Sequence, residues 1–377
     1  MCFSKTAGIL LLLLTPLGFT RPAEETTESG GAPVFTHWQS FGVEDGLPAQ
    51  KTTCVLVDEQ RGDVWVGTER GLALLRDGAF STFTRSDGLV YPVISSLTLC
   101  ERTGDLWIGT LGGLSRFSAG RFDNFNQLNS GLINDVVYAV EVIDGVVWAA
   151  TASGVSLYDP ERKDWQQFDH ENTVMHEPWC YGVTEAPGKA YVAVWGGGVV
   201  EYDRERHSWK AYRDPDHEME LDLYRDDGLI HDVTSGVSQA EGVLWVSTYF
   251  GLSRYDGRSW KGYLEHDTGL PSNFINAVRA RGRFAWLSTD DGLAAFDGDR
   301  WIVYRNDGDP SKGSVRLIEQ NAESRQLPTS GSLAHNFVLG AHPLEDRVWV
   351  ATSAGLSLGS REALKTLKQR STEALKH

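Results

Sequence analysis

Histidine, carboxylate and amide side chains recur at corresponding points of a repeated segment in this chain of 377 residues. The chain contains only 10 histidines, and three of them, His176, His231 and His335, occupy these points. Neutral imidazoles and carboxylates suit a divalent metal ion, which can polarise a substrate or activate water. The same groups can instead hydrogen-bond to a polar ligand. The candidate residues are Asn134, Asp135, His176, Glu177, His231, Asp232, Asn273, His335 and Asn336.

Three aromatic residues stand in short turns that elsewhere in the chain carry mostly small or polar residues. Trp195 precedes three glycines, and Tyr249 and Phe250 occupy the corresponding turn of the following segment. Exposed aromatic rings can stack on a sugar or hold a peptide. We therefore count these three residues among the candidate ligand-binding residues.

A short phrase that recurs along almost the whole chain predicts the elements that position these side chains. Its first copy reads Trp65-Val66-Gly67-Thr68 and continues to Gly71-Leu72; the weakest copy has Val194 in place of the threonine. The copies start at Trp65, Trp107, Trp148, Tyr191, Trp245, Trp286 and Trp349. Most starts lie about 40 to 45 residues apart, a period that is typical of a β-propeller.

One repeat can be divided into four strands by its apolar runs and turn residues. We expect strands over Asp135–Val142, Val146–Thr151, Val155–Tyr158 and Asp164–Phe168. Asp144-Gly145 is typical of a tight hairpin turn between the first two strands. Each repeat is therefore predicted to form one blade of four antiparallel strands.

The two ends of the repeat region complement each other. The last repeat stops after its third strand, at Gly355–Leu358, whereas Val34–Phe41 resembles a fourth strand without a blade of its own. We therefore expect the N-terminal strand to complete the last blade, which removes exposed sheet edges. The predicted fold is all-β, a closed seven-bladed propeller over residues 34–358.

The motifs resemble a known family, the two-component regulator propeller repeat. The resemblance rests on Asp45-Gly46-Leu47-Pro48 leading to Gly71-Leu72, and on the run from Trp245 to Asp256-Gly257. It covers about residues 34–358. It implies a periplasmic sensing domain, often for oligosaccharides, of a hybrid sensor kinase. No kinase segment follows Leu358 in this sequence, so we expect a stand-alone exported recognition module.

The predicted blade places the candidate residues at one end of a central channel. The loop that leads into a first strand and the turn between the second and third strands lie on the same face of a blade. Two long insertions, Asp214–Asp226 and Asn306–Gly331, also precede first strands. Long loops on one face are often functional, so we expect both beside this channel mouth.

The terminal segments and the charge predict an exported protein. Lys5 precedes the apolar run Ala7–Leu14, so residues 1–23 resemble a signal peptide, with a linker over 24–33 and a polar helix or tail over 359–377. We expect a periplasmic or secreted protein with no membrane span in the mature chain. The net charge of −16 disfavours nucleic acid and anionic membranes as partners.

The three cysteines that follow the predicted signal peptide do not form an obvious disulfide framework. Cys54, Cys100 and Cys180 are widely spaced and odd in number, so we interpret them as small buried residues. No paired-cysteine zinc or haem motif is present, and we expect no cofactor.

Three functions fit this pattern. The first is a binding module for a saccharide or a protein partner at the channel mouth. The second is a metal-dependent lyase or hydrolase that uses His176, Glu177, His231, Asp232 and His335. The third is a scaffold whose polar ring solvates the channel. No His-Glu-x-x-His or Gly-x-Ser-x-Gly motif occurs, which favours binding over catalysis. The sequence assigns no metal ligands with certainty and names no ligand.

Overall fold

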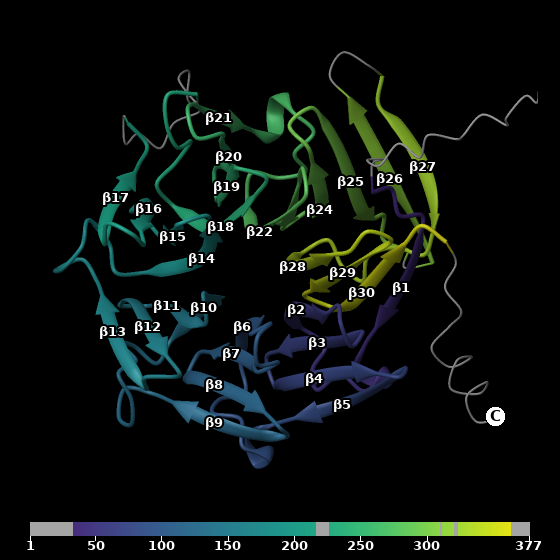
Figure 1. Cartoon of the computed structure of the whole chain (residues 1–377). Helices are drawn as coiled ribbons and strands as arrows, with labels where there is room; N and C mark the ends of the chain where they lie inside the picture. Colours follow the sequence, from purple (N-terminus) through teal and green to yellow (C-terminus); the bar gives the residue numbers. More distant parts are fainter. Residues whose placement is uncertain (1–32, 216–225, 310, 320–322, 363–377) are drawn as a thin grey trace, which may run out of the picture. The chain divides into compact units, whose positions relative to one another are not determined.

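Short runs of β-branched and aromatic residues form β-strands throughout the chain segments that the computed structural model describes. These are residues 33–215, 226–309, 311–319 and 323–362, which belong to the unit Pro33–His377 (Figure 1). The predicted signal peptide, almost all of the linker and most of the C-terminal tail lie outside the described residues, as does most of the acidic insertion.

Five sheets contain four antiparallel strands each. The first contains β2 (Thr52–Asp58), β3 (Asp63–Thr68), β4 (Gly71–Arg76) and β5 (Ala79–Phe83). The second contains β6 (Ile94–Leu99), β7 (Leu106–Thr110), β8 (Gly113–Ser118) and β9 (Arg121–Phe125). The third contains β10 (Val137–Ile143), β11 (Val146–Thr151), β12 (Gly154–Asp159) and β13 (Asp164–Phe168). The fourth contains β14 (Cys180–Ala186), β15 (Lys189–Val194), β16 (Gly198–Asp203) and β17 (Ser208–Tyr212). The fifth contains β18 (Thr234–Ala240), β19 (Val243–Thr248), β20 (Gly251–Tyr255) and β21 (Trp260–Tyr263).

The predicted four-strand unit is therefore present, with small shifts at its boundaries. The strand β10 begins at Val137 rather than at Asp135, because the Asp135 side chain accepts a hydrogen bond within the loop before the strand. Single turns of 3-10 helix precede three of the first strands, at Val43–Asp45, Arg85–Asp87 and Glu265–Asp267.

A sixth, ten-stranded sheet joins the two ends of the repeat region. Its strands, in spatial order, are β22 (Ile275–Arg281), β23 (Phe284–Thr289), β24 (Gly292–Phe296), β25 (Arg300–Asn306), β26 (Lys312–Glu319), β27 (Arg325–Ser330), β1 (His37–Phe41), β30 (Gly355–Ser360), β29 (Arg347–Thr352) and β28 (Val338–Pro343). The strand β1 pairs antiparallel with β30 and meets β27 in parallel at one point. The N-terminal strand thus pairs with the last repeat, as its sequence predicts.

The structure corrects the prediction for the insertion Asn306–Gly331. We expected a loop beside the channel mouth, but β26 and β27 form a hairpin that extends the sheet outward from β25. The backbone of β26 pairs with β25 along seven residues, from Arg300↔Glu319 to Asn306↔Gly313. The strands β26 and β27 therefore lie between β25 and β1 in the sheet.

The first strands of successive sheets lie side by side. The neighbouring pairs are β2 and β6, β6 and β10, β10 and β14, β14 and β18, β18 and β22, β22 and β28, and β28 and β2. Figure 1 shows these strands around a central opening, with the later strands of each sheet farther out. The residues at the start of each first strand are consequently brought near those of the neighbouring sheets.

The recurring phrase closes the turn between the second and third strands. Thr68 Oγ1 donates a hydrogen bond to the Gly71 carbonyl (2.8 Å) and accepts one from the Arg70 N–H (3.1 Å). Gly71 has φ +147°, and a Cβ there would lie 2.6 Å from the Phe83 carbonyl oxygen, so only glycine fits. In the copy with Val194, the Thr234 hydroxyl from the next sheet donates to the Val194 and Gly198 carbonyls instead.

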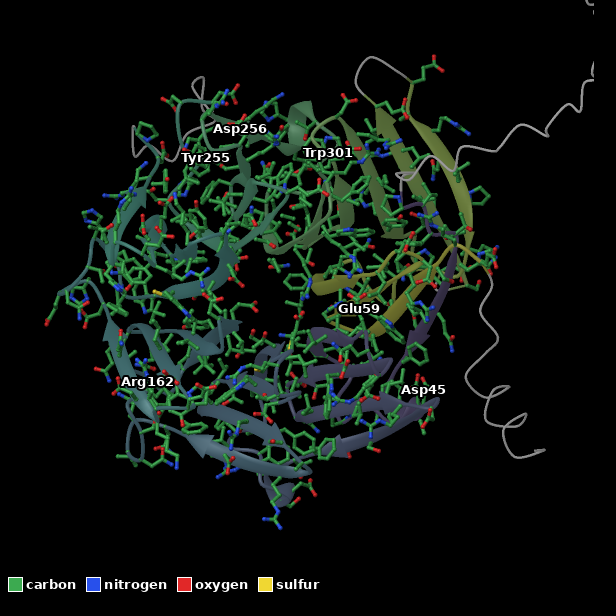
Figure 2. All side chains as sticks on the ribbon, viewed as in Figure 1. Asp45, Glu59, Arg162, Tyr255, Asp256 and Trp301 are labelled. Carbon is green, nitrogen blue, oxygen red and sulfur yellow. The ribbon has the colours of Figure 1, made fainter. Side chains whose placement is uncertain are left out.

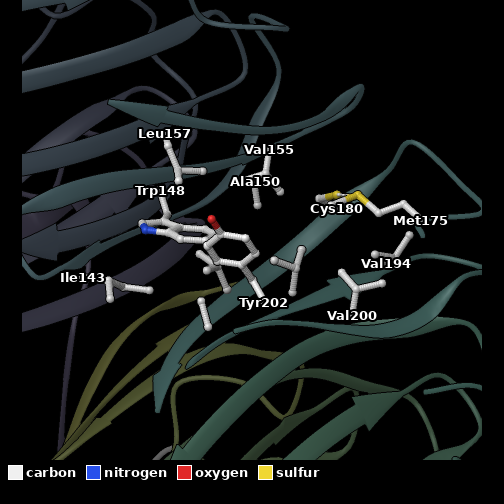
Figure 3. Packing of buried hydrophobic residues seen from close by; sticks show 13 residues of the cluster. Ile143, Trp148, Ala150, Val155, Leu157, Met175, Cys180, Val194, Val200 and Tyr202 are labelled. Atoms are coloured by element: carbon white, nitrogen blue, oxygen red, sulfur yellow. Dashed lines mark hydrogen bonds between the residues drawn. The ribbon is translucent and has the colours of Figure 1, made fainter. Parts of the chain in front are cut away.

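The phrase's tryptophans and the third-strand apolar residues fill the spaces between sheets. In the cluster of Figure 3, Trp148 packs against Tyr202 with ring centroids 5.7 Å apart. The Cys180 sulfur lies 3.9 Å from the Met175 sulfur in the same cluster. Cys100 and Cys180 are buried free thiols, as predicted, whereas Cys54 is half-buried and lines the central cavity.

Between the fourth and fifth sheets, Tyr191 stands where other copies of the phrase have tryptophan, and the buried carboxylate Glu201 lies beside it. Glu201 accepts hydrogen bonds from Lys189 Nζ (2.6 Å) and from the Tyr212 hydroxyl (2.8 Å). Burial favours its neutral form, but hydrogen bonds from Lys189, Tyr212 and Tyr191 outweigh burial and lower the pKa of Glu201 below its ordinary value of 4.5. The ionised carboxylate therefore stabilises this interface.

We expect the substitution Glu201→Gln to lower the free energy of unfolding by about 1.5–3 kcal/mol at neutral pH, since it weakens hydrogen bonds to a charged acceptor. Because the folded-state pKa is depressed, the carboxylate's contribution is present above pH 4.5 and is lost as pH falls through the lower folded value. Urea unfolding at neutral and at acidic pH measures this difference. The exposed Glu205→Gln is the control, and an equal loss for Glu201→Gln at both pH values contradicts the assignment.

Candidate functional site

We call the loops that lead into the first strands the lead-in loops. Most polar residues predicted at the channel mouth form hydrogen bonds that stabilise these loops. One set accepts a hydrogen bond from the backbone N–H two residues further along the chain. The acceptors are Asn134 Oδ1 (2.8 Å), His231 Nδ1 (2.9 Å) and His335 Nδ1 (2.9 Å), and Ser272 Oγ (3.1 Å), which is not among the predicted residues, accepts in the same way. Each such contact is a local turn, because the side chain replaces a backbone carbonyl as acceptor. In both histidines, Nδ1 is therefore engaged in the turn, which leaves Nε2 as the nitrogen that can meet a ligand.

The next residue of each lead-in loop ties it to the end of the preceding fourth strand or to the connection that follows that strand. The acceptors and their donors are Asp135 Oδ1 from Gln127 N (2.7 Å), Asp232 Oδ1 from Asp214 N (2.8 Å), Asn273 Oδ1 from Glu265 N (2.7 Å) and Asn336 Oδ1 from Asn306 N (2.6 Å). Asp232 also pairs with Arg213, at 3.1 Å. These carboxylates and amides thus hold the loops together.

The fourth lead-in loop places its polar pair differently. His176 is exposed, and Glu177 is half-buried beside the turn that follows Trp195. Among the described residues, no group of three or more histidine, cysteine, aspartate or glutamate side chains lies close enough together to hold a metal ion. Most of the candidate polar residues instead accept hydrogen bonds from backbone groups near their own loops.

Five aromatic rings form a continuous row across four neighbouring sheets, which we call the aromatic arc. Its members are Tyr138 of β10, Tyr181 of β14, Trp195 and Tyr249 of the turns after β15 and β19, and Phe274 before β22. The centroid distances are 4.3 Å for Tyr138–Tyr181, 5.1 Å for Tyr181–Trp195, 4.9 Å for Trp195–Tyr249 and 5.8 Å for Tyr249–Phe274.

The members of the arc remain accessible to solvent. Phe274 is 51% exposed, and the other four rings are partly exposed. The sequence pattern identified Trp195 and Tyr249 but missed Tyr138, Tyr181 and Phe274. Tyr138 and Tyr181 directly follow the buried first residue of a first strand, and a bulge at this point turns an additional side chain toward the channel. Comparing this position across the repeats would have identified both tyrosines.

Phe250, which follows Tyr249 of the arc, packs on a histidine. Its ring stacks on the His231 imidazole, with centroids 3.9 Å apart and planes at 21°. Burial lowers the pKa of His231 below its ordinary value, although Asp232 acts in the opposite direction. The imidazole is consequently neutral at physiological pH.

The backbone holds the turn residues of the arc against the lead-in loops. The Trp195 N–H donates to the Trp179 carbonyl at 2.9 Å, and the Tyr249 N–H donates to the Val233 carbonyl at 3.3 Å. These bonds join two different loops of one sheet. The positions of the two turn aromatics are therefore set by the sheet framework.

The arc borders a cavity of about 880 Å³ inside the ring of first strands. Tyr138 and Tyr181 line this cavity together with hydroxyl and amide side chains such as Ser95 and Asn276. Figure 2, which draws the side chains, shows an opening at the same place, with Glu59 labelled beside it in this view. The volume lies within the range of small-molecule pockets.

Comparison with known proteins relates the fold to extracellular domains of two-component systems. No family model matches the chain, and no curated protein matches its sequence. The extracellular domain of a putative hybrid two-component system from B. thetaiotaomicron matches 87% of this chain and 42% of its own, with a TM-score of 0.66 and 16% identity. A second such domain from that organism matches 88% and 40%, with a TM-score of 0.64 and 16% identity. The chain thus spans about two fifths of these two structures.

A lyase has a similar fold at lower identity. Virginiamycin B lyase from Staphylococcus aureus matches 86% of this chain and 99% of its own, with a TM-score of 0.59 and 10% identity. At these identities the likeness shows the fold alone, a β-propeller. Within the described residues, no helix is long and apolar enough to cross a membrane.

Proposed function

We propose that this chain is an exported recognition module, a closed seven-bladed propeller whose ligand binds at the aromatic arc. Residues 1–23 would direct export, residues 24–33 would form a linker, and residues 34–358 would form the propeller. The tail over 359–377 would lie beyond it. This reading combines the repeat, the ring of first strands and the fold likeness to extracellular sensor domains.

The aromatic arc is the observation that carries the proposal. A ring face presents an apolar surface to sugar C–H groups or to peptide side chains, and Trp and Tyr combine this surface with a polar tip. Five rings in a row, from Tyr138 to Phe274, provide such a surface over four sheets. The border of this surface would contain Phe250 and the polar lead-in residues Asn134, Asp135, His176, Glu177, His231, Asp232, Asn273, His335 and Asn336.

We favour a saccharide over a protein partner because the arc adjoins a cavity of about 880 Å³ lined by hydroxyl and amide groups. A saccharide presents both C–H faces and hydroxyls, which match these two kinds of surface. The sensor likeness supports an extracytoplasmic location, in the periplasm or outside the cell.

We expect the double substitution of Trp195→Ala and Tyr249→Ala to weaken saccharide binding on a glycan array by at least about tenfold, since each ring–ligand stack contributes on the order of 1 kcal/mol. Phe337→Ala is the matched control, because Phe337 is an exposed aromatic at the mouth end of the last repeat and lies outside the arc. Binding that survives the double substitution argues against this site. Capture of a protein partner without any glycan signal would favour the protein-binding reading.

A further inference from the structure

Arg279 is an arginine that lines the central cavity. It lies in β22, is exposed, and lines the cavity of about 880 Å³. No hydrogen bond or ion pair joins its guanidinium to another residue within the described ranges. Arg281, two residues further along the same strand, differs in this respect. Its guanidinium pairs with both Glu59 oxygens, at 2.6 and 3.0 Å.

Glu141 and Glu59 attract the Arg279 guanidinium, but within the described residues neither forms a hydrogen bond or an ion pair with it. Glu185 pairs with Arg204 at 3.0 Å, and the same arginine also pairs with Asp144. Glu141 accepts a hydrogen bond from Thr98 Oγ1 at 3.1 Å. Burial raises the pKa of Glu141, although Arg279 acts in the opposite direction. Lys51 adds a second cation to the cavity wall. A ligand carboxylate would therefore supply the hydrogen-bonded partner that Arg279 lacks among the described residues.

The rest of the cavity wall suits a polyhydroxy ligand. Ser95, Ser235 and Asn276 line it, and their side chains donate to backbone carbonyls, so their oxygens keep lone pairs for a ligand's hydroxyl groups. Tyr138 and Tyr181 line it too and belong to the aromatic arc. A ligand can thus contact the arc and the cavity together.

We propose that the central channel binds an acidic sugar, of the uronic-acid class, with its carboxylate paired to the Arg279 guanidinium. The planar guanidinium matches a carboxylate in a two-bond arrangement, and the channel walls shield this pair from bulk water. The sugar ring then lies toward Tyr138 and Tyr181. This inference rests on the proposed saccharide binding and names the class of saccharide.

Isothermal titration of the full chain with D-glucuronate and with D-glucose tests the proposal, because the two sugars differ by one carboxylate. We expect glucuronate to bind at least about tenfold more tightly than glucose, as a charge-assisted pair predicts. Arg279→Gln should weaken glucuronate binding by at least about tenfold and leave glucose unchanged. Arg281→Gln is the matched control on the same strand, and it should bind glucuronate as the wild type does.

Glu141→Gln provides a second readout that does not depend on losing Arg279. Removing a neighbouring carboxylate should strengthen glucuronate binding by about two- to tenfold, since it removes repulsion between like charges. Circular dichroism of each variant establishes that it is folded.

Three results would overturn the inference. They are equal affinity for the two sugars, unchanged glucuronate binding by folded Arg279→Gln, and no binding of either sugar by the wild type. In the first two cases the sugars still bind, so the proposed saccharide recognition stands and only the acidic class fails. In the third case, the glycan array decides about the proposed function separately. If the wild type binds a glycan there and the Trp195→Ala and Tyr249→Ala double variant does not, saccharides bind at the aromatic arc and only the channel proposal fails.

Discussion

The substitution Phe35→Ala is expected to lower the free energy of unfolding by about 3–5 kcal/mol, the cost of removing a large buried aromatic ring. Phe35 is 0% exposed, and its ring stacks on Trp286 (5.9 Å) and on Tyr304 (6.2 Å). The Tyr304 hydroxyl accepts a hydrogen bond from the Phe35 N–H and donates one to the Pro33 carbonyl. Phe35 therefore anchors the chain just before β1, which completes the sheet of the last repeat.

Urea unfolding followed by circular dichroism measures this effect. Leu128→Ala is the control, because Leu128 is 97% exposed and its removal should change stability by less than about 0.5 kcal/mol. If Phe35→Ala is as stable as the control, the N-terminal segment does not hold the ends of the repeat region together.

The substitution Trp107→Ala is expected to cost a similar amount, about 3–5 kcal/mol. Trp107 is 1% exposed and occupies the first position of the recurring phrase. Its ring stacks on Phe125 at 5.7 Å and meets the edge of Tyr158 at 5.9 Å, so its loss leaves a cavity between the second and third sheets. The same urea experiment measures the change.

Trp195→Ala is the informative comparison for Trp107→Ala. Trp195 is half-buried at the mouth, so its removal should cost about 1 kcal/mol of stability while weakening ligand binding. Trp107→Ala should instead reduce stability and keep the ligand affinity of the folded fraction. A reversed pattern would show that the phrase tryptophan takes part in binding.

These predictions divide the side chains into a framework that determines stability and a surface that determines ligand binding. The framework consists of the phrase tryptophans, the threonine-closed turns and the N-terminal anchor, and it repeats from sheet to sheet. The aromatic arc and Arg279 occur where individual repeats depart from the pattern. A binding site at the mouth can therefore change its side chains without changing the turns that carry it.

Much of the framework was predictable from the sequence alone. The spacing of Trp65, Trp107 and the later copies predicted four-stranded units, because alternating apolar residues and glycine turns are local signals. The unpaired Val34–Phe41 predicted a strand that pairs with the last repeat, and β1 does pair with β30. The insertion Asn306–Gly331 was misread, since a loop and a hairpin of equal length are hard to distinguish where the strand pattern is irregular.

The candidate site was only partly predictable. Trp195 and Tyr249 stood out because they replace small residues in a repeated turn. Their contact at 4.9 Å, and the addition of Tyr138, Tyr181 and Phe274, depend on distances between sheets that no local pattern encodes. The histidines and carboxylates of the lead-in loops were predicted to line the mouth, but the sequence could not show that most of them bind their own backbone.

The sequence by itself determined the strand units, their turns and the positions at which side chains accumulate, because these depend on residues close together in the chain. Only the tertiary structure decided which side chains remain available to a ligand. His231 and Asp135 are used by nearby backbone groups, whereas Arg279 faces the cavity because its strand lies at the inner edge of its sheet. Whether a side chain is available to a ligand depends on contacts between segments that are distant in the sequence. Those contacts form only when the sheets pack around the channel.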